Sequence, residues 1–295
     1  MKLKSSSEFI AKSLEGSLEE KEREIAVLKE ELRRIRERLR NSIVPVEEML
    51  KRRGMVIFKK EAKDDTLVPS DDYEEVFYEK LKRYSFRLFL RDLIKYQHGF
   101  SVKDLIHYST EEVTREYLDY CIECGIVIAL KEGRFSLSRV PIKSFGITLE
   151  WFVSKILEKE FVASTIWGVR FKNTVKGGDY DLIANMEGKI LYMEIKSSPP
   201  KQIYDTEIRT FLDRIDEINS DISIFFMDTE LRMKDKIVPM FDIELQNRYG
   251  MKRPEIQRME RELFSIQDRI FILNSKDNIV TNIGTALNWY FRKRG

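Results

Sequence analysis

Residues 8 to 42 carry apolar side chains that recur alternately four and three positions apart. Because this spacing averages ~3.5 residues, it gathers the side chains into one narrow stripe along a helix, the pattern of a coiled-coil seam. Residues 1–44 are therefore predicted to form a coiled-coil helix that ends at Val44-Pro45. We expect the seam, residues 14–39, to pair with a second copy as a parallel or antiparallel homodimer, or to fold back on its own chain. The seam positions are Leu14, Leu18, Lys21, Ile25, Leu28, Leu32, Ile35 and Leu39.

Residues 45–82 have a mixed pattern and are interpreted as a connector. A short helix is predicted around Val46–Arg53, and an apolar strand is predicted at Met55–Phe58. After a polar loop, a further helix is predicted from Asp71. The connector thus separates the coiled coil from the globular part of the chain.

Residues 83–143 change to a pattern of three helices followed by a hairpin. The helices are predicted at Arg87–Tyr96, after Ser101, and at Thr110–Cys124, where Ser109 is the expected N-cap. The segment IVIAL-KEG-RFSLS then supplies two short strands around a turn. This succession resembles a winged helix-turn-helix domain.

That resemblance implies either a DNA-binding module or a protein-interaction module. In the first case the third helix would enter the major groove, and Lys131 and Arg134 on the wing would lie near phosphate. The acids Glu111, Glu112 and Glu116 at the start of that helix disfavour contact with a DNA backbone. Both uses stay open.

Residues 144–295 alternate between helical and strand patterns. This alternation predicts an α/β domain with a mixed sheet flanked by helices, within a chain that is mixed α+β overall. The expected helices are residues 149–161, 206–218, a long stretch from 231, a segment opened by Pro254, and 280–292. The expected strands are residues 167–171, the hairpin that ends at 196, and the apolar segments ISIFFMD and RIFILN.

Composition limits the possible classes of protein. At 295 residues the chain is long for one domain, and 42% hydrophobic residues can build substantial cores. The net charge of +2 does not by itself indicate a nucleic-acid binder, so any basic surface must be local. No apolar run approaches the ~20 residues of a membrane span, and the first residues lack a signal-peptide core. We therefore expect a soluble, cytoplasmic protein with no membrane partner.

The cysteines give no indication of a metal centre. Cys121 and Cys124 form a Cys-x-x-Cys within a helical pattern, and the sequence has no other cysteine. A structural zinc site of this kind needs a second ligand pair, and an iron–sulfur cluster within one chain needs four cysteines. His98 and His107 are possible extra ligands, but two buried helix cysteines are the better interpretation.

The segment GGDYDLIANMEGKILYMEIK carries two acids, a turn, and then a third acid followed by a lysine. If Glu187-Gly188 is a two-residue hairpin loop, Asp181 faces Glu194 and Asp179 faces Lys196, all on one face of the two strands. Two opposed carboxylates at ~4 Å repel each other by roughly 4 kcal/mol at an effective dielectric constant near 20. A fold tolerates this repulsion if one acid takes up a proton or if a cation lies between the two. A divalent metal ion is the better interpretation, so the hairpin is predicted to be a chemical site.

Asp-x-Asp before an apolar pair, followed by Glu-x-Lys at the end of the next strand, resembles the PD-(D/E)xK nuclease superfamily. The segments GGDYDLIA and LYMEIKSS most resemble the corresponding segments of Holliday-junction resolvases and Mrr-type restriction enzymes. The resemblance implies a restriction endonuclease-like core in which Asp181 and Glu194 bind metal and Lys196 assists the attacking water. It also implies a helix acid upstream, which falls on Glu150. The sequence departs from the pattern at Tyr180, where the family has proline.

Carboxylates on adjacent strands suit Mg²⁺ or Mn²⁺, which keep water and phosphate in their remaining positions. Asp179 is either a further metal ligand or an ion-pair partner of Lys196. Glu150 is either a catalytic acid or an ordinary first-turn acid after Thr148, favoured by the helix dipole. Gly177 and Gly178 lack a Cβ, so the backbone there can approach a phosphate.

These observations predict a metal-dependent nuclease that hydrolyses phosphodiester bonds in DNA. The alternative is a non-catalytic DNA-binding, scaffolding or transcription-regulatory protein that uses the winged domain and the coiled coil. Opposed acids favour the enzyme, because a scaffold has no use for them. The sequence does not select among branched, duplex and single-stranded substrates, or between DNA and RNA.

Overall fold

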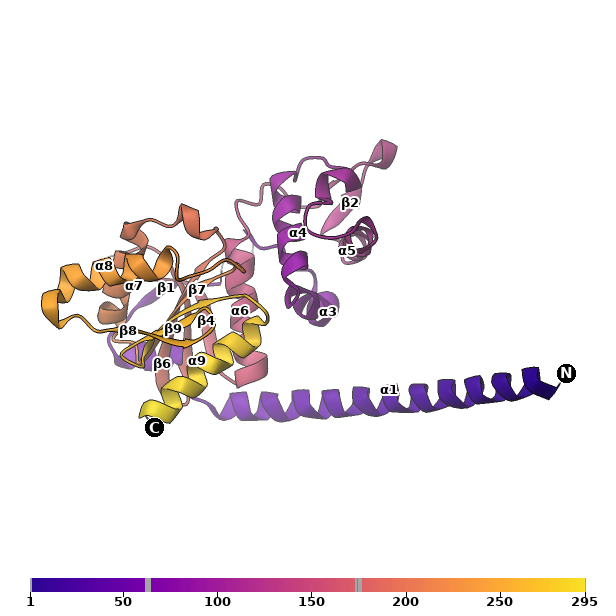
Figure 1. Cartoon of the computed structure of the whole chain (residues 1–295), viewed down its shortest axis with the longest axis horizontal. Coiled ribbons are helices and arrows are strands. Elements are labelled where there is room, and N and C mark those ends of the chain that lie inside the picture. Colours follow the sequence, from indigo (N-terminus) through magenta and orange to yellow (C-terminus); the bar gives the residue numbers. More distant parts are fainter. Residues whose placement is uncertain (1, 62–64, 173, 175–176, 295) are drawn as a thin grey trace. The chain divides into compact units, whose positions relative to one another are not determined.

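The computed structural model describes residues 2–61, 65–172, 174 and 177–294, and the side chains of residues 2–17, 19 and 294 lie outside that description. The chain divides into two compact units, residues 1–43 and residues 44–295 (Figure 1). Each unit is described by itself below. The predicted boundaries at residues 82 and 144 fall inside the second unit and stay predictions.

The first unit is a single helix, α1 (Lys2–Ser42), which ends just before Val44-Pro45 as predicted. The seam residue Leu14 has its side chain outside the described part of the chain. The other six apolar seam side chains are all exposed, by between 46% and 60% of their surface. Within this unit the stripe is therefore not covered.

An eight-stranded mixed sheet forms the centre of the second unit. Its strand order is β1-β4-β5-β6-β7-β10-β9-β8, in which β6 with β7 and β7 with β10 are parallel and the other neighbours are antiparallel. The strands are β1 (Ile57–Lys59), β4 (Ser164–Phe171), β5 (Tyr180–Met186), β6 (Lys189–Lys196), β7 (Ile222–Met227), β8 (Ile256–Glu260), β9 (Leu263–Ile266) and β10 (Ile270–Asn274).

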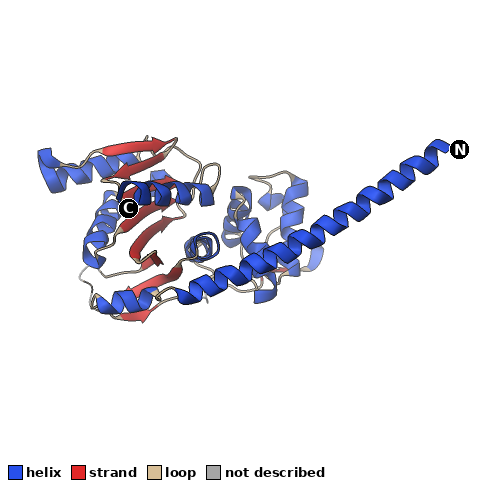
Figure 2. Cartoon of the chain, turned by 90° about the horizontal axis from the view of Figure 1, so that it is seen from below, coloured by secondary structure: helices blue, strands red, loops and turns tan. Residues whose placement is uncertain are grey.

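Helices cover both faces of this sheet (Figures 1 and 2). One core layer lies between the sheet and α6 (Gly146–Phe161) and α9 (Ile279–Arg294). The other lies between the sheet and α2 (Val46–Arg52), α7 (Asp205–Ile218) and α8 (Ile237–Tyr249). The predicted mixed sheet flanked by helices is confirmed. Residues 45–59 belong to it, because β1 pairs with β4 at one edge.

Residues 254–266 have a different secondary structure from the one predicted. The predicted helix after Pro254 is wrong, because this segment forms the antiparallel strands β8 and β9. Ile256, Met259 and Leu263 are spaced three and four apart, which imitates a helical stripe. The chain instead turns at Arg261, which has a left-handed φ of 45°, and β9 pairs antiparallel with β10. The helix expected from residue 231 begins only at Ile237.

Residues 83–143 contain the predicted helices and hairpin. The segments are α4 (Tyr84–Lys95), a 3-10 turn at Val102–Leu105, α5 (Glu111–Glu123), β2 (Val127–Ala129) and β3 (Phe135–Leu137), the last two paired antiparallel. The predicted N-cap of α5 is wrong by one residue, because the Thr110 hydroxyl accepts the Val113 N–H. The resemblance to a winged helix stays a prediction.

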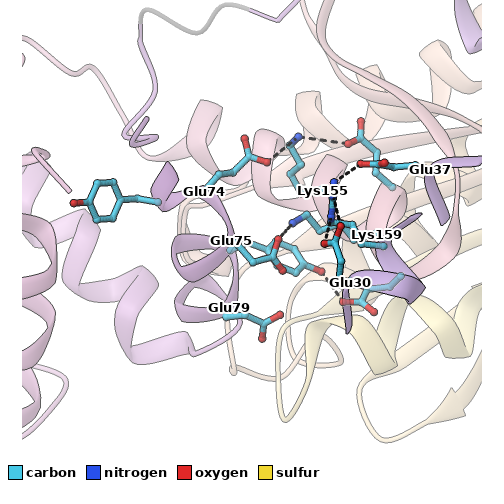
Figure 3. Close-up of polar contacts among 12 residues, drawn as sticks. Glu30, Glu37, Glu74, Glu75, Glu79, Lys155 and Lys159 are labelled. Carbon is cyan, nitrogen blue, oxygen red and sulfur yellow. Dashed lines mark hydrogen bonds and ion pairs between the residues drawn. The ribbon is translucent and has the colours of Figure 1, made fainter. Parts of the chain in front are cut away.

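Two sets of ion pairs join the helices before residue 96 to the sheet domain. Buried Arg87 of α4 lies 2.8 Å from Asp228, which directly follows β7 and is fully buried. On α6, Lys155 lies 3.1 Å from Glu74, and Lys159 pairs with Glu75, both acids of α3 (Asp71–Leu81) (Figure 3).

Cys121 and Cys124 are free and buried at the end of α5, as the sequence analysis favoured. His107 is paired with Asp92 at 2.8 Å. None of the described helices is both long enough and apolar enough to cross a bilayer.

Candidate active site

The acidic hairpin has the predicted register. Met186 pairs with Lys189, and the ladder continues to Leu182 opposite Met193. Glu187 and Gly188 form the loop, and their φ values of 52° and 79° are those that a two-residue hairpin turn of type I′ requires. The next positions along this ladder are Asp181 and Glu194, so the two acids lie opposite each other at the end of the hairpin.

Strand β5 changes faces at Asp181. Trp167 and Leu182 pair with each other and pack in one core layer, whereas Val169 and Tyr180 pair with each other and pack in the other. Gly168, opposite Asp181, has a φ of 57°, a left-handed conformation that glycine adopts without strain.

The side chain of Asp181 reaches the backbone of the neighbouring strand β6. Its Oδ2 accepts the backbone N–H of Ile195 at 2.6 Å. A carboxylate held by a backbone donor has a defined orientation, and only part of its hydrogen-bonding capacity is used.

Glu194 is buried and is held by three side chains. Lys196 Nζ donates to Oε1 at 2.8 Å, and Arg214 of α7 donates to Oε2 at 3.0 Å. The Tyr192 hydroxyl donates to the same Oε2. Burial alone would raise the pKa of Glu194, but the positive charges of Lys196 and Arg214 outweigh burial and hold that pKa below its ordinary value. Glu194 is thus an anion whose charge is balanced within the chain.

Asp181 is in the opposite situation. Burial and the negative charge of Glu194 raise the pKa of Asp181 to about 8, and Lys196 only partly offsets them. Lys196 and Arg214 pair with Glu194, and no basic side chain among the described residues forms an ion pair with Asp181.

Glu150 is the third acid of the site. A Cβ added at Gly168 would lie 3.7 Å from Glu150 Oε2, which places this carboxyl beside the glycine opposite Asp181. Burial, followed by the charges of Asp181 and Asp179, raises the pKa of Glu150 well above its ordinary value. Its expected place in the first helical turn is wrong, because α6 begins at Gly146. The helix dipole therefore does not explain an acid at position 150, whereas a role beside the other acids of the site does.

Asp179 is placed differently from the prediction. It precedes β5 and forms an ion pair with Arg170 of β4, with one hydrogen bond of 2.9 Å to Oδ2. The expected pair between Asp179 and Lys196 is wrong, because Lys196 bonds to Glu194 and lies 3.7 Å from Glu207. A role for Asp179 as a metal ligand stays a prediction.

The predicted nucleic-acid contacts fall in two places. Gly177 and Gly178 precede Asp179 in left-handed conformations, and the Gly177 carbonyl accepts a hydrogen bond from Arg214 at 3.3 Å. Lys131 and Arg134 are exposed in the loop between β2 and β3, which form a separate sheet. The structure brings the glycines to the acids, and Lys131 and Arg134 belong to a different part of the fold.

A divalent metal ion fits this donor set through two carboxylates. Among the described residues, no three His, Cys, Asp or Glu side chains are arranged to hold a metal ion together. Mg²⁺ commonly uses only one or two carboxylates and completes its shell with water and phosphate. A cation beside Asp181 and Glu150 would also offset the burial and the mutual repulsion that raise their pKa values.

Three residues of the site were missed from sequence. Arg214 and Glu207 lie on α7, and Tyr192 lies two residues before Glu194 on the same strand face. The position of Tyr192 could have been found from strand alternation. Arg214 and Glu207 could not, because the sequence does not say which side of α7 meets the hairpin end.

No family model and no curated protein matches the chain. Protein VC1899 from Vibrio cholerae is 14% identical with a TM-score of 0.42, over 60% of this chain and 52% of that chain. Can2 from Sulfobacillus thermosulfidooxidans, solved in complex with cyclic tetra-adenylate, is 13% identical with a TM-score of 0.43, over 74% of this chain and 55% of that one. The chain spans about half the length of these two proteins.

Proposed function

We propose that this protein is a metal-dependent nuclease that hydrolyses phosphodiester bonds in DNA. The observation that carries the proposal is the meeting of three acids, Asp181, Glu194 and Glu150, at the end of the β5–β6 hairpin, where Lys196 and Arg214 bond to only one of the three, Glu194. A fold that only needed stability would gain by replacing such acids, because carboxyl groups crowded together in a partly buried site repel one another or must take up protons. A site that binds a cation needs them.

Asp181 and Glu194 would hold the ion as oxygen ligands, with Glu150 beside them. When bound there, Mg²⁺ or Mn²⁺ would make water a stronger nucleophile and balance charge on the phosphoryl group. Lys196 presents its ammonium group at the same strand end, where it can orient the attacking water or offset developing negative charge. Gly177 and Gly178 offer backbone without side chains where the nucleic-acid strand would pass.

The test is a cleavage assay on branched, single-stranded and duplex DNA and on single-stranded RNA, each with Mg²⁺, with Mn²⁺ and with EDTA. We expect cleavage of at least one DNA with metal, none with EDTA, and none by Asp181→Asn. An enzyme that cuts only the RNA would keep the site assignment and overturn DNA as the substrate.

A non-catalytic scaffold is the second candidate, and one observation favours it. Both oxygens of Glu194 are already bonded within the chain, as in an ordinary buried ion-pair network. A scaffold would bind DNA or protein through residues 83–143 and cleave none of the substrates. Binding that is independent of metal and unchanged by Asp181→Asn would support this candidate over the nuclease.

We also propose that the protein is a homodimer that pairs through residues 14–39. The exposed seam of α1 supports this proposal, since isolated amphipathic helices gain most of their stability by burying such a stripe.

A further inference from the structure

The two oxygens of Glu194 are held by two different bases, and these bases differ in how they are anchored. Lys196 belongs to the same strand as Glu194 and donates a hydrogen bond to its Oε1. Arg214 comes from α7 and reaches Oε2 with one terminal nitrogen, while its other terminal nitrogen bonds to the Gly177 carbonyl at 3.3 Å. The guanidinium also stacks on the Tyr180 ring, 5.0 Å from its centroid. Arg214 therefore bridges the acid to the glycine segment.

Arg214 has a donor to spare. Its side chain is only 9% exposed, and its Nε is buried without a hydrogen-bond partner among the described residues. The guanidinium has five N–H donors in a planar fork that matches the oxygens of a phosphate as well as those of a carboxylate. An orphaned donor of this kind is the group to which an incoming anion would bind.

Gly178 allows the guanidinium of Arg214 to lie directly against the backbone. A Cβ at this position would lie 2.7 Å from the terminal nitrogen of Arg214 that bonds to Gly177, and the φ of 79° also favours glycine. The glycine segment that the sequence analysis assigned to phosphate approach is therefore the segment that lies against this arginine.

We propose that Arg214 is the resident counter-ion of Glu194 and that a phosphate of the nucleic acid draws it away, so that the affinity of Asp181 and Glu194 for a divalent cation rises when a phosphate binds. The inference rests on the proposed metal-binding role of these acids. Arg214 and a cation compete for one charge, and a phosphate that takes Arg214 ends the competition. Arg214 is thus a positioning residue, and the coupling is reciprocal, since the cation must raise phosphate affinity by the same factor.

The experiment measures Mn²⁺ binding to the full chain by electron paramagnetic resonance, with and without thymidine 5′-monophosphate. This probe carries a phosphate but no diester bond, so no turnover is involved, and a protein-free titration corrects for its own Mn²⁺ binding. In the wild type we expect the nucleotide to tighten Mn²⁺ binding by about tenfold, within the usual range for coupling between two sites. In Arg214→Gln we expect similarly tight binding without the nucleotide, and a much smaller further gain with it than in the wild type.

Three further variants make the outcome specific. Arg209→Gln, on the same helix and 3.5 Å from Glu244, is the matched control and should behave as the wild type. Arg214→Lys keeps the charge and should bind Mn²⁺ as weakly as the wild type, which separates loss of charge from a folding defect. Glu194→Gln should bind Mn²⁺ poorly throughout. If Arg214→Gln binds Mn²⁺ no better than the wild type, the inference is overturned while the metal site stands. If no form binds Mn²⁺, both the inference and the proposed metal dependence fail.

Discussion

Asp181 and Glu194 were predicted as two opposed metal ligands, and the structure gives the two carboxyl groups different surroundings. Two bases and a tyrosine hydroxyl hold Glu194 as an anion, whereas burial beside that anion raises the pKa of Asp181 to about 8. The opposition of the two acids follows from hairpin register and could be predicted. Their difference depends on Arg214, which meets the hairpin only in the folded chain.

At this scale we predict the effect of removing charge without changing volume. Asp181→Asn and Glu194→Gln should each abolish metal-dependent cleavage and leave the fold intact. Lys196→Ala should slow cleavage by a factor on the order of 10²–10³, which is usual for one lost transition-state-stabilising group. Single-turnover cleavage and circular dichroism provide the measurements.

The control for these variants is Glu187→Gln, in the exposed loop of the same hairpin, which should keep full activity. If Asp181→Asn keeps full Mg²⁺-dependent activity, then Asp179 is the better ligand or the assignment of the site is wrong.

Asp228 gives a prediction about stability. Burial would raise its pKa, but Arg87 and Arg91 outweigh burial and hold that pKa below its ordinary value. The folded protein therefore binds this proton less readily than the unfolded chain, so Asp228 contributes stability at neutral pH. That contribution begins to fall below about pH 5 and is lost as the pH falls through the folded pKa.

Asp228→Asn should lower the free energy of unfolding at pH 7 by about 3–5 kcal/mol, because Arg87 remains buried without its partner charge. Below about pH 5 the free energy of unfolding of the variant should also depend less on pH than that of the wild type. Denaturant unfolding at several pH values measures both. Asp216→Asn, an exposed acid, should change stability little, and an equal loss in both variants would contradict this account.

At the scale of elements, the sequence predicted best where periodicity and turn chemistry agree. The β5–β6 hairpin has both alternation and a Glu-Gly loop, and its register was correct. The helix predicted after Pro254 was wrong because the apolar residues there have helical spacing. No glycine or proline marks the turn at Arg261. The change of faces at Asp181 was not predicted either. It accompanies the left-handed conformation of Gly168, and the sequence does not show which conformation a glycine within a strand adopts.

Gly168 provides a test at this scale. Gly168→Ala should lower the free energy of unfolding by roughly 1 kcal/mol or more, because alanine is strained at a φ of 57°. The change should also weaken Mn²⁺ binding, because Asp181 depends on this turn for its orientation. Gly284→Ala is the matched control. It lies inside α9, where a Cβ would make ordinary contact with Phe161 at 3.5 Å, so it should not destabilise the protein.

At the scale of the whole molecule, the charges beside the α1 seam favour one orientation of a dimer. Glu24 and Glu31 flank the seam on one side, and Lys29 and Arg36 flank it on the other, five residues further along. In a parallel coiled coil these flanking positions face each other across the two helices, so each acid would meet a base. The ion pairs of Arg33 with Glu30 and Glu37 lie away from the seam.

We predict that Glu24→Lys with Glu31→Lys weakens self-association, because each former ion pair becomes a repulsion. Sedimentation equilibrium measures the effect. Mixing the Glu24→Lys, Glu31→Lys variant with the Lys29→Glu, Arg36→Glu variant should restore every one of these pairs in a parallel heterodimer, because one helix is then basic and the other acidic at all four positions. The control, Glu20→Lys with Glu37→Lys, makes the same change of net charge outside the seam and should stay dimeric. An unchanged dimer in the first variant would exclude parallel pairing.

The last prediction joins the dimer to the chemistry. Each Leu or Ile that a partner covers contributes roughly 1.5–3 kcal/mol before entropy is subtracted, so six exposed seam residues can outweigh the cost of association. A dimer carries two acidic sites, the arrangement needed to cut both strands of a duplex in one encounter. Deleting residues 1–42 should therefore give a monomer by light scattering that still cleaves but nicks duplex DNA more readily than it breaks both strands. If the full-length chain is itself a monomer at micromolar concentration, the seam must be covered by its own chain or by another protein, and the deletion should leave the ratio of nicks to double-strand breaks unchanged.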